Sequence, residues 1–276
     1  MLGASRATGQ APAPAKINLT LVVGPLRPDG KHEVATVLQR LHLGDRISIV
    51  PAERLRVEGF ADDTLVRAAL EGLASRVGVD PRWSARITKR IPVAAGLGGG
   101  SSDAATAMRL ANATLSAPLS DAELEELAAA LGADVPFFLR LGPQLATGDG
   151  STLEPLDLPQ DFRVLVLVPH GEAKESTAAV YRRFDGRGGA KGFEQRRAAL
   201  LDALGRVRSA RDLADLPRND LARSSLADEL MRLGAFRADV TGAGPALYGL
   251  FLHRQDAEAA ARALRPRGRV RVTVPA

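Results

Sequence analysis

The sequence predicts an α+β fold with two domains, and three observations support it. The chain has 276 residues, enough to bury a substantial core in one large domain or two ordinary ones. Strand-like and helix-like patterns follow one another without the regular βαβ rhythm of a doubly wound sheet. A stretch rich in Gly, Pro and Asp at residues 145–161 marks a domain boundary. We therefore predict a disordered tail at 1–12, an N-terminal domain at 13–158 and a C-terminal domain at 159–276.

The first half of the chain has a clear strand pattern at AKINLTLVV, residues 15–23, where apolar and polar residues alternate. Lys16, Asn18 and Thr20 share its polar face, and a turn at PLRPDG follows. The elements predicted in this half are strands at 15–23, 43–50 and 83–91 and helices at 64–77, 104–115 and 120–131. Ser120 and Glu123 form a capping box for the last helix, and Ser101 or Ser102 is available as N-cap of the helix before it.

The second half begins with the buried-strand pattern RVLVLVP at 163–169. After it the sequence predicts helices near 176–184, 194–207 and 220–233, a strand and loop at 238–251, a helix near 256–264 and a terminal strand, RVRVTV. There is no internal repeat.

Composition limits the classes of function. A hydrophobic fraction of 45% with 25% charged residues is typical of a soluble globular protein, and no apolar run is long enough to cross a bilayer. Residues 1–14 lack the apolar core of a secretory signal, so we expect a cytoplasmic protein. The absence of cysteine excludes disulfides, thiolate catalysis and cysteine-based zinc sites.

The net charge of +5 is modest, because 32 acidic residues offset 37 basic ones. Aromatic residues make up only 4%, and no motif for base stacking or groove reading is present. We therefore expect a solvated basic surface that suits a small polyanionic ligand, with neither nucleic acid nor a membrane as partner. Lysine is rare in this arginine-rich chain: the five are Lys16, Lys31, Lys89, Lys174 and Lys191.

The stretch PVAAGLGGGSSDAA, residues 92–105, joins a predicted strand to a predicted helix. It is not a P-loop, because it contains no lysine, and it is not the dinucleotide fingerprint, because Ser101 occupies the place of the third glycine. Glycines still let consecutive backbone N–H groups surround an anion, and the N-terminus of the next helix adds positive potential. The sequence thus favours a polyphosphate cradle over the alternative of a flexible connector.

Five motifs in order resemble one family. They are APAKINLTL at 13–21, RPDGKHE at 27–33, the GLGGGSS loop at 96–102, LGADVPFFL at 131–139 and TGAGPALYGLF at 241–251. The set is similar to the galactokinase, homoserine kinase, mevalonate kinase and phosphomevalonate kinase (GHMP) superfamily, and within it to the 4-diphosphocytidyl-2-C-methyl-D-erythritol kinase family. The resemblance implies a two-domain GHMP kinase fold with a ribosomal-protein-S5-like N-terminal domain and an α/β C-terminal domain. It also implies ATP-dependent phosphorylation of the 2-hydroxyl of 4-diphosphocytidyl-2-C-methyl-D-erythritol.

The resemblance implies two catalytic residues, Asp134 as proton acceptor and Lys16 beside it. Taken alone, Asp134 before Val135 and Pro136 is also a good helix N-cap, and a lysine on a strand is ordinarily a solvated charge. Asn18 lies on the same strand face as Lys16, roughly 7 Å along the strand, so the pair can form the floor of a polar cleft.

The resemblance places the nucleotide on the loop before and within the glycine run, with Mg²⁺ implied by ATP chemistry and its ligands unknown. The expected nucleotide-binding residues are Lys89, Pro92, Val93, Ala94, Ala95, Gly96, Leu97, Gly98, Gly99, Gly100, Ser101 and Ser102. Lys89 is equally compatible with an exposed charge at a strand end. Thr64 stands where the family often has Asn, so the resemblance implies less about the adenine contacts than about the phosphate contacts.

The cytosine of the substrate is expected at His32 and Tyr181, each of which also suits an ordinary surface or packing role. Lys31 stands where the family typically has an aromatic residue, so stacking from that side is lost, and an ammonium near the base or diphosphate compensates for part of it. Thr241, Gly242 and Gly244 are expected to wall the phosphates or substrate, with a structural turn as the alternative.

Two other functions remain open at this stage. One is a GHMP kinase that acts on another small alcohol, mevalonate or homoserine, and the other is a non-catalytic nucleotide- or RNA-binding protein. For the kinase we expect a monomer or a weak homodimer.

Overall fold

The structure, a computed structural model, describes residues 9–61, 63–171 and 176–276. It forms two compact units. Unit 1 comprises the described part of Met1–Ala15 together with Leu43–Ile91 and Gly98–Leu141, and unit 2 comprises Lys16–His42, Pro92–Leu97 and Gly142–Ala276. The predicted α+β class is confirmed, whereas a domain boundary near residue 159 stays a prediction.

Two long strands contribute to both units. Strand β1 spans Gly9–Leu26 and begins inside the segment predicted as a tail, whose residues 1–8 lie outside the described residues. Strand β2 spans His32–Pro51 and is far longer than the predicted strand at 43–50. Its residues 34–41 are all buried, Gln39 and Arg40 included, so no alternation of polar and apolar residues marks them in the sequence.

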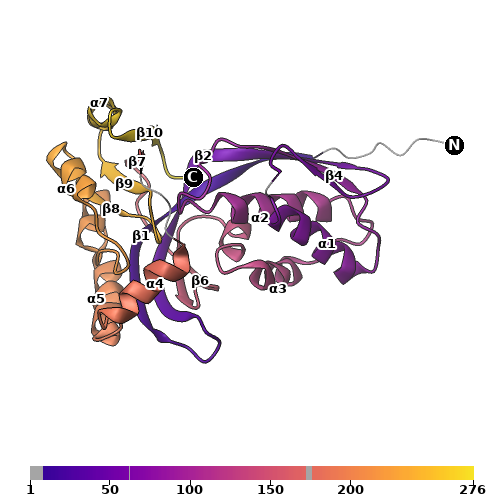
Figure 1. The fold of residues 1–276 in the computed structure, drawn as a ribbon, viewed down its shortest axis with the longest axis horizontal. Coiled ribbons are helices and arrows are strands. Elements are labelled where there is room, and N and C mark those ends of the chain that lie inside the picture. Colours follow the sequence, from indigo (N-terminus) through magenta and orange to yellow (C-terminus); the bar gives the residue numbers. More distant parts are fainter. Residues whose placement is uncertain (1–8, 62, 172–175) are drawn as a thin grey trace. The chain divides into compact units, whose positions relative to one another are not determined.

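Unit 1 packs helices against a small sheet. Strand β4 (Trp83–Thr88) pairs antiparallel with β2, Arg46 opposite Thr88, and parallel with β3 (Arg56–Glu58). Helices α1 (Leu65–Val77), α2 (Gly99–Asn112) and α3 (Asp121–Leu131) lie on one side of β2 and β4 (Figure 1). The predicted capping box of Ser120 and Glu123 is present at the start of α3, and the 3-10 helix η1 (Pro136–Leu139) follows it.

The predicted N-cap of α2 is wrong. The helix begins at Gly99, and its N-cap is Gly98, whose φ of 70° lies in the left-handed region that glycine adopts most easily. Ser101 and Ser102 therefore lie in the first turn of the helix, because the glycine run itself forms the transition from loop to helix.

Unit 2 contains two strand assemblies. Strand β5 (Gln144–Gly148) pairs with β2 and with β6 (Thr152–Pro155), so the stretch at 145–161, where the sequence predicted a domain boundary, includes a hairpin. An antiparallel sheet has the order β10-β7-β9-β8, formed by Gly268–Thr273, Arg163–Pro169, Leu247–Phe251 and Arg237–Val240. Helices α6 (Ser225–Arg232) and α7 (Arg254–Leu264) pack on this sheet through a core that includes Leu165, Leu230 and Leu264.

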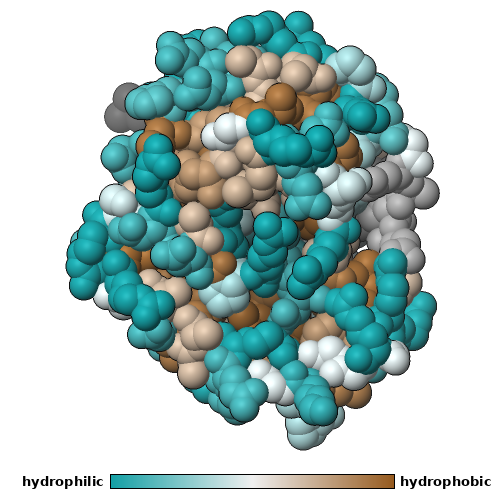
Figure 2. Space-filling model, turned by 90° about the vertical axis from the view of Figure 1, so that its left-hand side faces the viewer, coloured by the Kyte–Doolittle hydropathy of each residue, from teal (hydrophilic) through white to brown (hydrophobic). Residues whose placement is uncertain are grey.

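The other helical elements of unit 2 are α4 (Thr177–Gly186), α5 (Phe193–Arg206) and the 3-10 helix η2 (Ala210–Asp215), which the sequence did not predict. The side that carries α5 and α6 is mostly hydrophilic, with separate smaller hydrophobic areas (Figure 2). Helix α5 carries an exposed ion pair between Arg206 and Asp202. In the described ranges, no helix combines the length and apolar character that a membrane span requires.

The helix predicted at 220–233 is shorter than expected. Asn219 Oδ1 accepts a hydrogen bond from the Leu221 N–H at 2.8 Å, which holds the chain in a turn. The Ser224 side chain then accepts from the Leu226 N–H and caps α6, so the helix starts only at Ser225. Side chains that bond their own backbone thus compete with the helix over residues 220–224.

A buried arginine ties unit 2 together. Arg237 is 4% exposed. Its guanidinium donates to Leu19 O at 2.6 Å from Nη2 and 3.0 Å from Nε, and to the Tyr248 hydroxyl at 2.9 Å. It also donates to four further carbonyl oxygens, those of Leu213, Ala214, Leu216 and Pro217. One side chain therefore satisfies acceptors on β1, on β9, on η2 and on the chain that follows η2.

We expect Arg237→Lys to lower the free energy of unfolding by about 3 kcal/mol or more, because three ammonium donors cannot reach all of these acceptors and buried carbonyls lose their partners. Urea unfolding of the full chain measures the change. Arg232→Lys, an exposed change on α6, is the control and should stay within about 0.5 kcal/mol of the parent. Equal stabilities of the two variants would contradict the role given to Arg237.

Candidate functional site

A group of buried polar side chains, here called the polar floor, centres on Lys16 and Asn18 of β1 in unit 2. Lys16 and Asn18 are 4% and 5% exposed, and Lys16 Nζ donates to Asn18 Oδ1 at 2.8 Å. Asn18 Nδ2 donates to Thr36 Oγ1 at 2.8 Å, and the Asn18 N–H donates to Thr241 Oγ1 at 2.9 Å. Lys16, Asn18 and Thr241, which the sequence proposed separately, are therefore one hydrogen-bonded group. Thr36 on β2 completes it.

The first part of the glycine loop, residues 92–97, is anchored to the same unit. The Lys16 N–H donates to Leu97 O at 3.0 Å, and the Ala246 N–H donates to Ala95 O at 3.1 Å. Gly96 has φ 82°, and a Cβ there would lie 2.8 Å from Thr241 O, so only glycine fits. This part of the loop is thus fixed beside the turn 241–244.

Gly242 and Gly244 belong to that turn, with φ of 59° and 80°. A Cβ on Gly242 would lie 3.5 Å from Asn18 Oδ1 and 3.8 Å from Lys16 Nζ. The backbone of the turn therefore faces the polar floor. The side-chain amide of Asn219 supports the turn from elsewhere in the unit, because it donates to Gly242 O at 2.8 Å.

The second part of the loop belongs to unit 1 and runs into α2. Ser101 is half-buried, whereas Ser102 is fully buried, with a hydroxyl that has no hydrogen-bond partner in the described residues. The first turn of α2 combines glycine backbone with these two hydroxyls. Such a turn can hold anionic oxygens through N–H groups and the helix dipole.

Beneath this turn, Lys89 lies between two carboxylates. Its Nζ donates to Asp45 Oδ2 at 2.5 Å and to Asp103 Oδ2 at 2.8 Å, and both carboxyl side chains are fully buried. A Cβ on Gly99 would lie 3.3 Å from Lys89 Nζ. The Lys89 side chain is 17% exposed, so the alternative of an exposed strand-end charge is wrong.

One ammonium cannot neutralise two buried carboxylates. Burial, together with the nearby charge of Asp45, raises the pKa of Asp103 to about 7, although Lys89 opposes this shift. Asp103 Oδ1 also has no hydrogen-bond partner within the described part of the chain. Burial lowers the pKa of Lys89, but its bonds to Asp103 and Asp45 outweigh burial and raise it. Near neutral pH a substantial fraction of Asp103 is therefore protonated.

Asp134 lies in unit 1, half-buried, between α3 and η1. The N-cap of η1 is Val135, so the N-cap alternative for Asp134 does not hold. Lys16 lies in unit 2.

His32 meets α4 in unit 2. Its ring lies 4.7 Å from the Tyr181 ring, tilted by 33°, and its Nε2 is 2.8 Å from Asp185 Oδ1. Phe184 closes the cluster with its ring 6.1 Å from that of His32. The two residues expected to recognise a base thus lie in contact, and Asp185 orients the imidazole.

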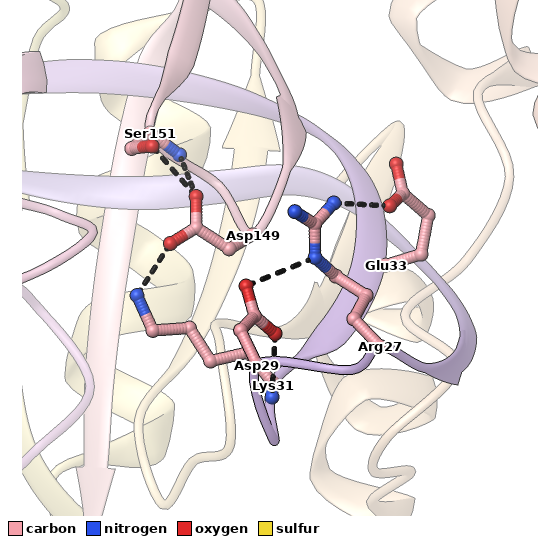
Figure 3. A network of polar contacts seen from close by, with 6 residues as sticks. All are labelled: Arg27, Asp29, Lys31, Glu33, Asp149 and Ser151. Atoms are coloured by element: carbon pink, nitrogen blue, oxygen red, sulfur yellow. Dashed lines mark hydrogen bonds and ion pairs between the residues drawn. The ribbon is translucent and has the colours of Figure 1, made fainter.

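Lys31 points to the β5–β6 turn. Its Nζ donates to Asp149 Oδ2 at 2.5 Å, and the Arg27 guanidinium binds Asp29 and Glu33 nearby (Figure 3). Burial alone would raise the pKa of Asp149, but bonds from Lys31 and Ser151 lower it to about 2. The Lys31 side chain is 53% exposed, so its ion pair is a surface one.

Sequence reasoning missed four polar residues of these groups. Thr36 lies on the part of β2 that the sequence did not reveal, and Asp45 on the same strand has an ordinary surface-like context. Asp103 was visible inside the quoted glycine motif, and Asp185 stands four residues after Tyr181 on one helix face. The position of Asp103 inside the motif and the spacing of Asp185 from Tyr181 were therefore usable signals in the sequence.

No group of three or more His, Asp or Glu side chains within the described residues is arranged to hold a metal ion.

Three comparisons with known proteins place these features in context. Residues 64–142 match the GHMP kinases N terminal domain, and residues 224–269 match the GHMP kinases C terminal domain. A 4-diphosphocytidyl-2-C-methyl-D-erythritol kinase of Anaeromyxobacter sp. (strain Fw109-5) is 40% identical in an alignment 270 positions long that covers 92% of this chain and 86% of the relative.

Solved structures agree. The crystal structure of a 4-(cytidine 5'-diphospho)-2C-methyl-D-erythritol kinase is 31% identical, with a TM-score of 0.79 over 97% of this chain and 99% of the other. A mevalonate kinase of Methanococcus jannaschii is similar at 14% identity, with a TM-score of 0.73 over 99% of both chains. That second likeness concerns the fold alone.

The Asp103 group predicts a pH dependence of stability. Folded Asp103 keeps its proton up to about pH 7, whereas an aspartate in the unfolded chain releases it near pH 4. The folded state binds more protons between these values, so stability falls as pH rises from about 4 to about 7. We expect Asp103→Asn, which cannot titrate, to gain stability relative to the parent across this window.

Unfolding midpoints of both proteins at several pH values between 5 and 8.5 test this. Asp121→Asn, an exposed change at the start of α3, is the control and should track the parent at every pH. A constant difference between Asp103→Asn and the parent would show that Asp103 does not titrate in this range.

Proposed function

This chain belongs to the GHMP kinases and, within them, to the 4-diphosphocytidyl-2-C-methyl-D-erythritol kinase family, and on that premise we propose its reaction. It transfers the γ-phosphoryl group of ATP to the 2-hydroxyl of 4-diphosphocytidyl-2-C-methyl-D-erythritol, in the non-mevalonate route to isoprenoid precursors. The observation that carries this proposal is 40% identity over 92% of the chain to a kinase of that name. The polar floor and the glycine loop supply groups suited to the chemistry.

Lys16 and Asp134 are the proposed catalytic residues. The oxygen of the 2-hydroxyl forms a bond to the γ-phosphorus, the bond to the leaving diphosphate oxygen breaks, and the hydroxyl proton passes to the Asp134 carboxylate. Lys16 favours loss of that proton and steadies negative charge on the transferring group. Asn18 holds the Lys16 ammonium in place through its 2.8 Å hydrogen bond.

The loop residues fit a bound triphosphate. Between Pro92 and Ser102 the chain offers glycine backbone, the half-buried Ser101 and the N-terminus of α2, all of which suit phosphate oxygens. ATP, when bound there, supplies the phosphoryl group, and Mg²⁺ is its expected counter-ion. Lys89 is a positioning residue in this proposal, because two carboxylates already share its charge and its ammonium lies close to Gly99 at the start of α2.

His32 and Tyr181 are proposed to recognise the cytosine. Asp185 fixes the imidazole at Nε2, which leaves Nδ1 as the atom able to bond the base edge. Thr241, Gly242 and Gly244 then face the substrate from the turn that borders the polar floor. Lys31 contributes positive charge at the edge of this region. It occupies the position where the family typically has an aromatic residue.

Other functions are less well supported. A mevalonate or homoserine kinase shares the fold, but the relatives with substantial sequence identity are named for the cytidine diphosphate compound. A purely nucleotide- or RNA-binding role leaves the Lys16, Asn18 and Thr241 group without a purpose. A cytoplasmic location and a monomeric or weakly dimeric state stay predictions.

The reaction is tested by ADP release from the purified full chain with three acceptors: the cytidine diphosphate compound, mevalonate and homoserine. We expect turnover with the first only. Asp134→Asn should lower kcat roughly 10³-fold, because it removes the proton acceptor while keeping the side-chain shape. Asp157→Asn, an exposed change, is the control. Equal turnover of mevalonate would remove the substrate assignment, and an unimpaired Asp134→Asn enzyme would remove the mechanism.

Lys31 gives a second test. We expect Lys31→Tyr to lower KM for the cytidine substrate about five-fold with kcat unchanged, because base stacking contributes about 1 kcal/mol or more and binds ground and transition states alike. The exposed ion pair with Asp149 that is lost contributes at most about 1 kcal/mol. Steady-state kinetics beside a Lys191→Tyr control check the result, and a KM that rises would show that the Lys31 ammonium itself binds the substrate.

A further inference from the structure

Unit 2 contains a cavity of about 420 Å³, and Gly244 is the one residue of its described lining that also has a role in the proposed reaction. It is enclosed by α4, by the segment 221–224 before α6 and by the turn between β8 and β9. The volume is in the range of small-molecule sites. Its lining therefore indicates what kind of molecule it suits.

The lining is apolar at its base and cationic at its rim. Val180, Leu221 and Val240 are buried aliphatic residues. Arg183, Arg187 and Arg223 carry the charge, and no acidic side chain is among the described residues that line the cavity. Arg223 has no ion-pair partner in the described ranges, and the printed hydrogen bonds of Arg187 go to neutral carbonyl oxygens, so these two guanidinium groups give the rim a positive potential.

Two of these arginines differ in their bonding. Arg187 donates to the carbonyl oxygens of Asp220 and Leu221, and its guanidinium lies 5.7 Å from the Phe184 ring centroid, so it holds the wall in place. Arg223 is exposed and makes no hydrogen bond or ion pair within the described ranges of the chain. Its donors are thus open to a ligand.

The cavity is separate from the proposed cytosine site, although both use α4. Arg187, directly after α4, lines the cavity. On the helix itself, Tyr181 and Asp185 face His32, whereas Val180 and Arg183 face the cavity. At about 100° per residue, these two sets point roughly 150° apart around the helix. One molecule in contact with His32 therefore does not reach the arginine rim on the other side.

We propose that this cavity is a second ligand site, for a small phosphate or diphosphate monoester that carries a short hydrocarbon group. Guanidinium groups bind phosphate oxygens in pairs of parallel hydrogen bonds, which fits the rim. The aliphatic base removes the hydrocarbon from water. Ala243 and Gly244 line this cavity, and Gly242 of the same turn faces the polar floor, so the turn 242–244 is shared by both sites.

Isothermal titration calorimetry of the full chain with butyl diphosphate, inorganic pyrophosphate and butanol tests the proposal. Butyl diphosphate should bind at least roughly ten-fold more tightly than pyrophosphate, because the alkyl group adds apolar burial, and butanol should not bind measurably. Arg223→Gln should weaken butyl diphosphate binding about ten-fold. Arg182→Gln, a matched change on α4 outside the cavity lining, should leave it unchanged.

Arg223 has no partners to lose among the described residues, so its variant should unfold at the same temperature as the parent. Hydrogen exchange with butyl diphosphate bound should protect amides of 221–224 and 243–244. Equal effects of Arg223→Gln and Arg182→Gln, or equal affinity for pyrophosphate and butyl diphosphate, would overturn the proposal. So would displacement of butyl diphosphate by cytidine diphosphate in direct competition, because the cavity would then be part of the nucleotide substrate's own site. These outcomes do not depend on which alcohol the kinase phosphorylates.

Discussion

Unit 2 is organised by a strand that is buried on both faces yet polar on one of them. Lys16 and Asn18 of β1 are almost completely buried, so neighbouring groups supply most of their hydrogen-bond partners. Thr36 of β2 and Thr241 of the β8–β9 turn do so for Asn18. The need to satisfy buried polar groups thereby brings together residues more than 200 positions apart in the chain. It also places the backbone of the turn at Gly242 beside the Lys16 ammonium.

The same strand is fixed by its carbonyl groups. Leu19 O accepts from the Arg237 guanidinium and from the Tyr248 hydroxyl, at 2.8 Å for the latter. Burial raises the pKa of Tyr248 to about 12, so the hydroxyl stays a donor at any physiological pH. Side-chain and backbone polar groups of β1 are therefore held from different directions. A floor held in this way keeps Lys16 in position without help from a ligand.

Much of this arrangement can be read from the sequence, and the exceptions have physical causes. Helices with apolar stripes and caps, such as α1 and α3, are predictable because local signals decide them. The part of β2 at 32–42 is not, because burial on both faces erases alternation, and Gln39 and Arg40 look like surface residues. The glycine loop, Lys16 and Asn18 stand out by residue type, whereas Asp45 becomes significant only through its distance from Lys89. Local sequence patterns do not reveal contacts between residues that are far apart in the chain, such as Asp45 and Lys89.

At two of the five lysine positions, the structure explains why this arginine-rich chain has lysine instead of arginine. Lys89 fits between Asp45 and Asp103, and Lys16 fits beside Asn18, where a compact ammonium can bond oxygens that approach from different directions. A planar guanidinium presents its donors in one plane and would not serve two converging carboxylates in the same space. Arg237 shows the converse, because six acceptors around a buried site need the five N–H donors that only arginine provides. At Lys89 and Arg237, donor geometry rather than charge therefore explains which basic residue is present.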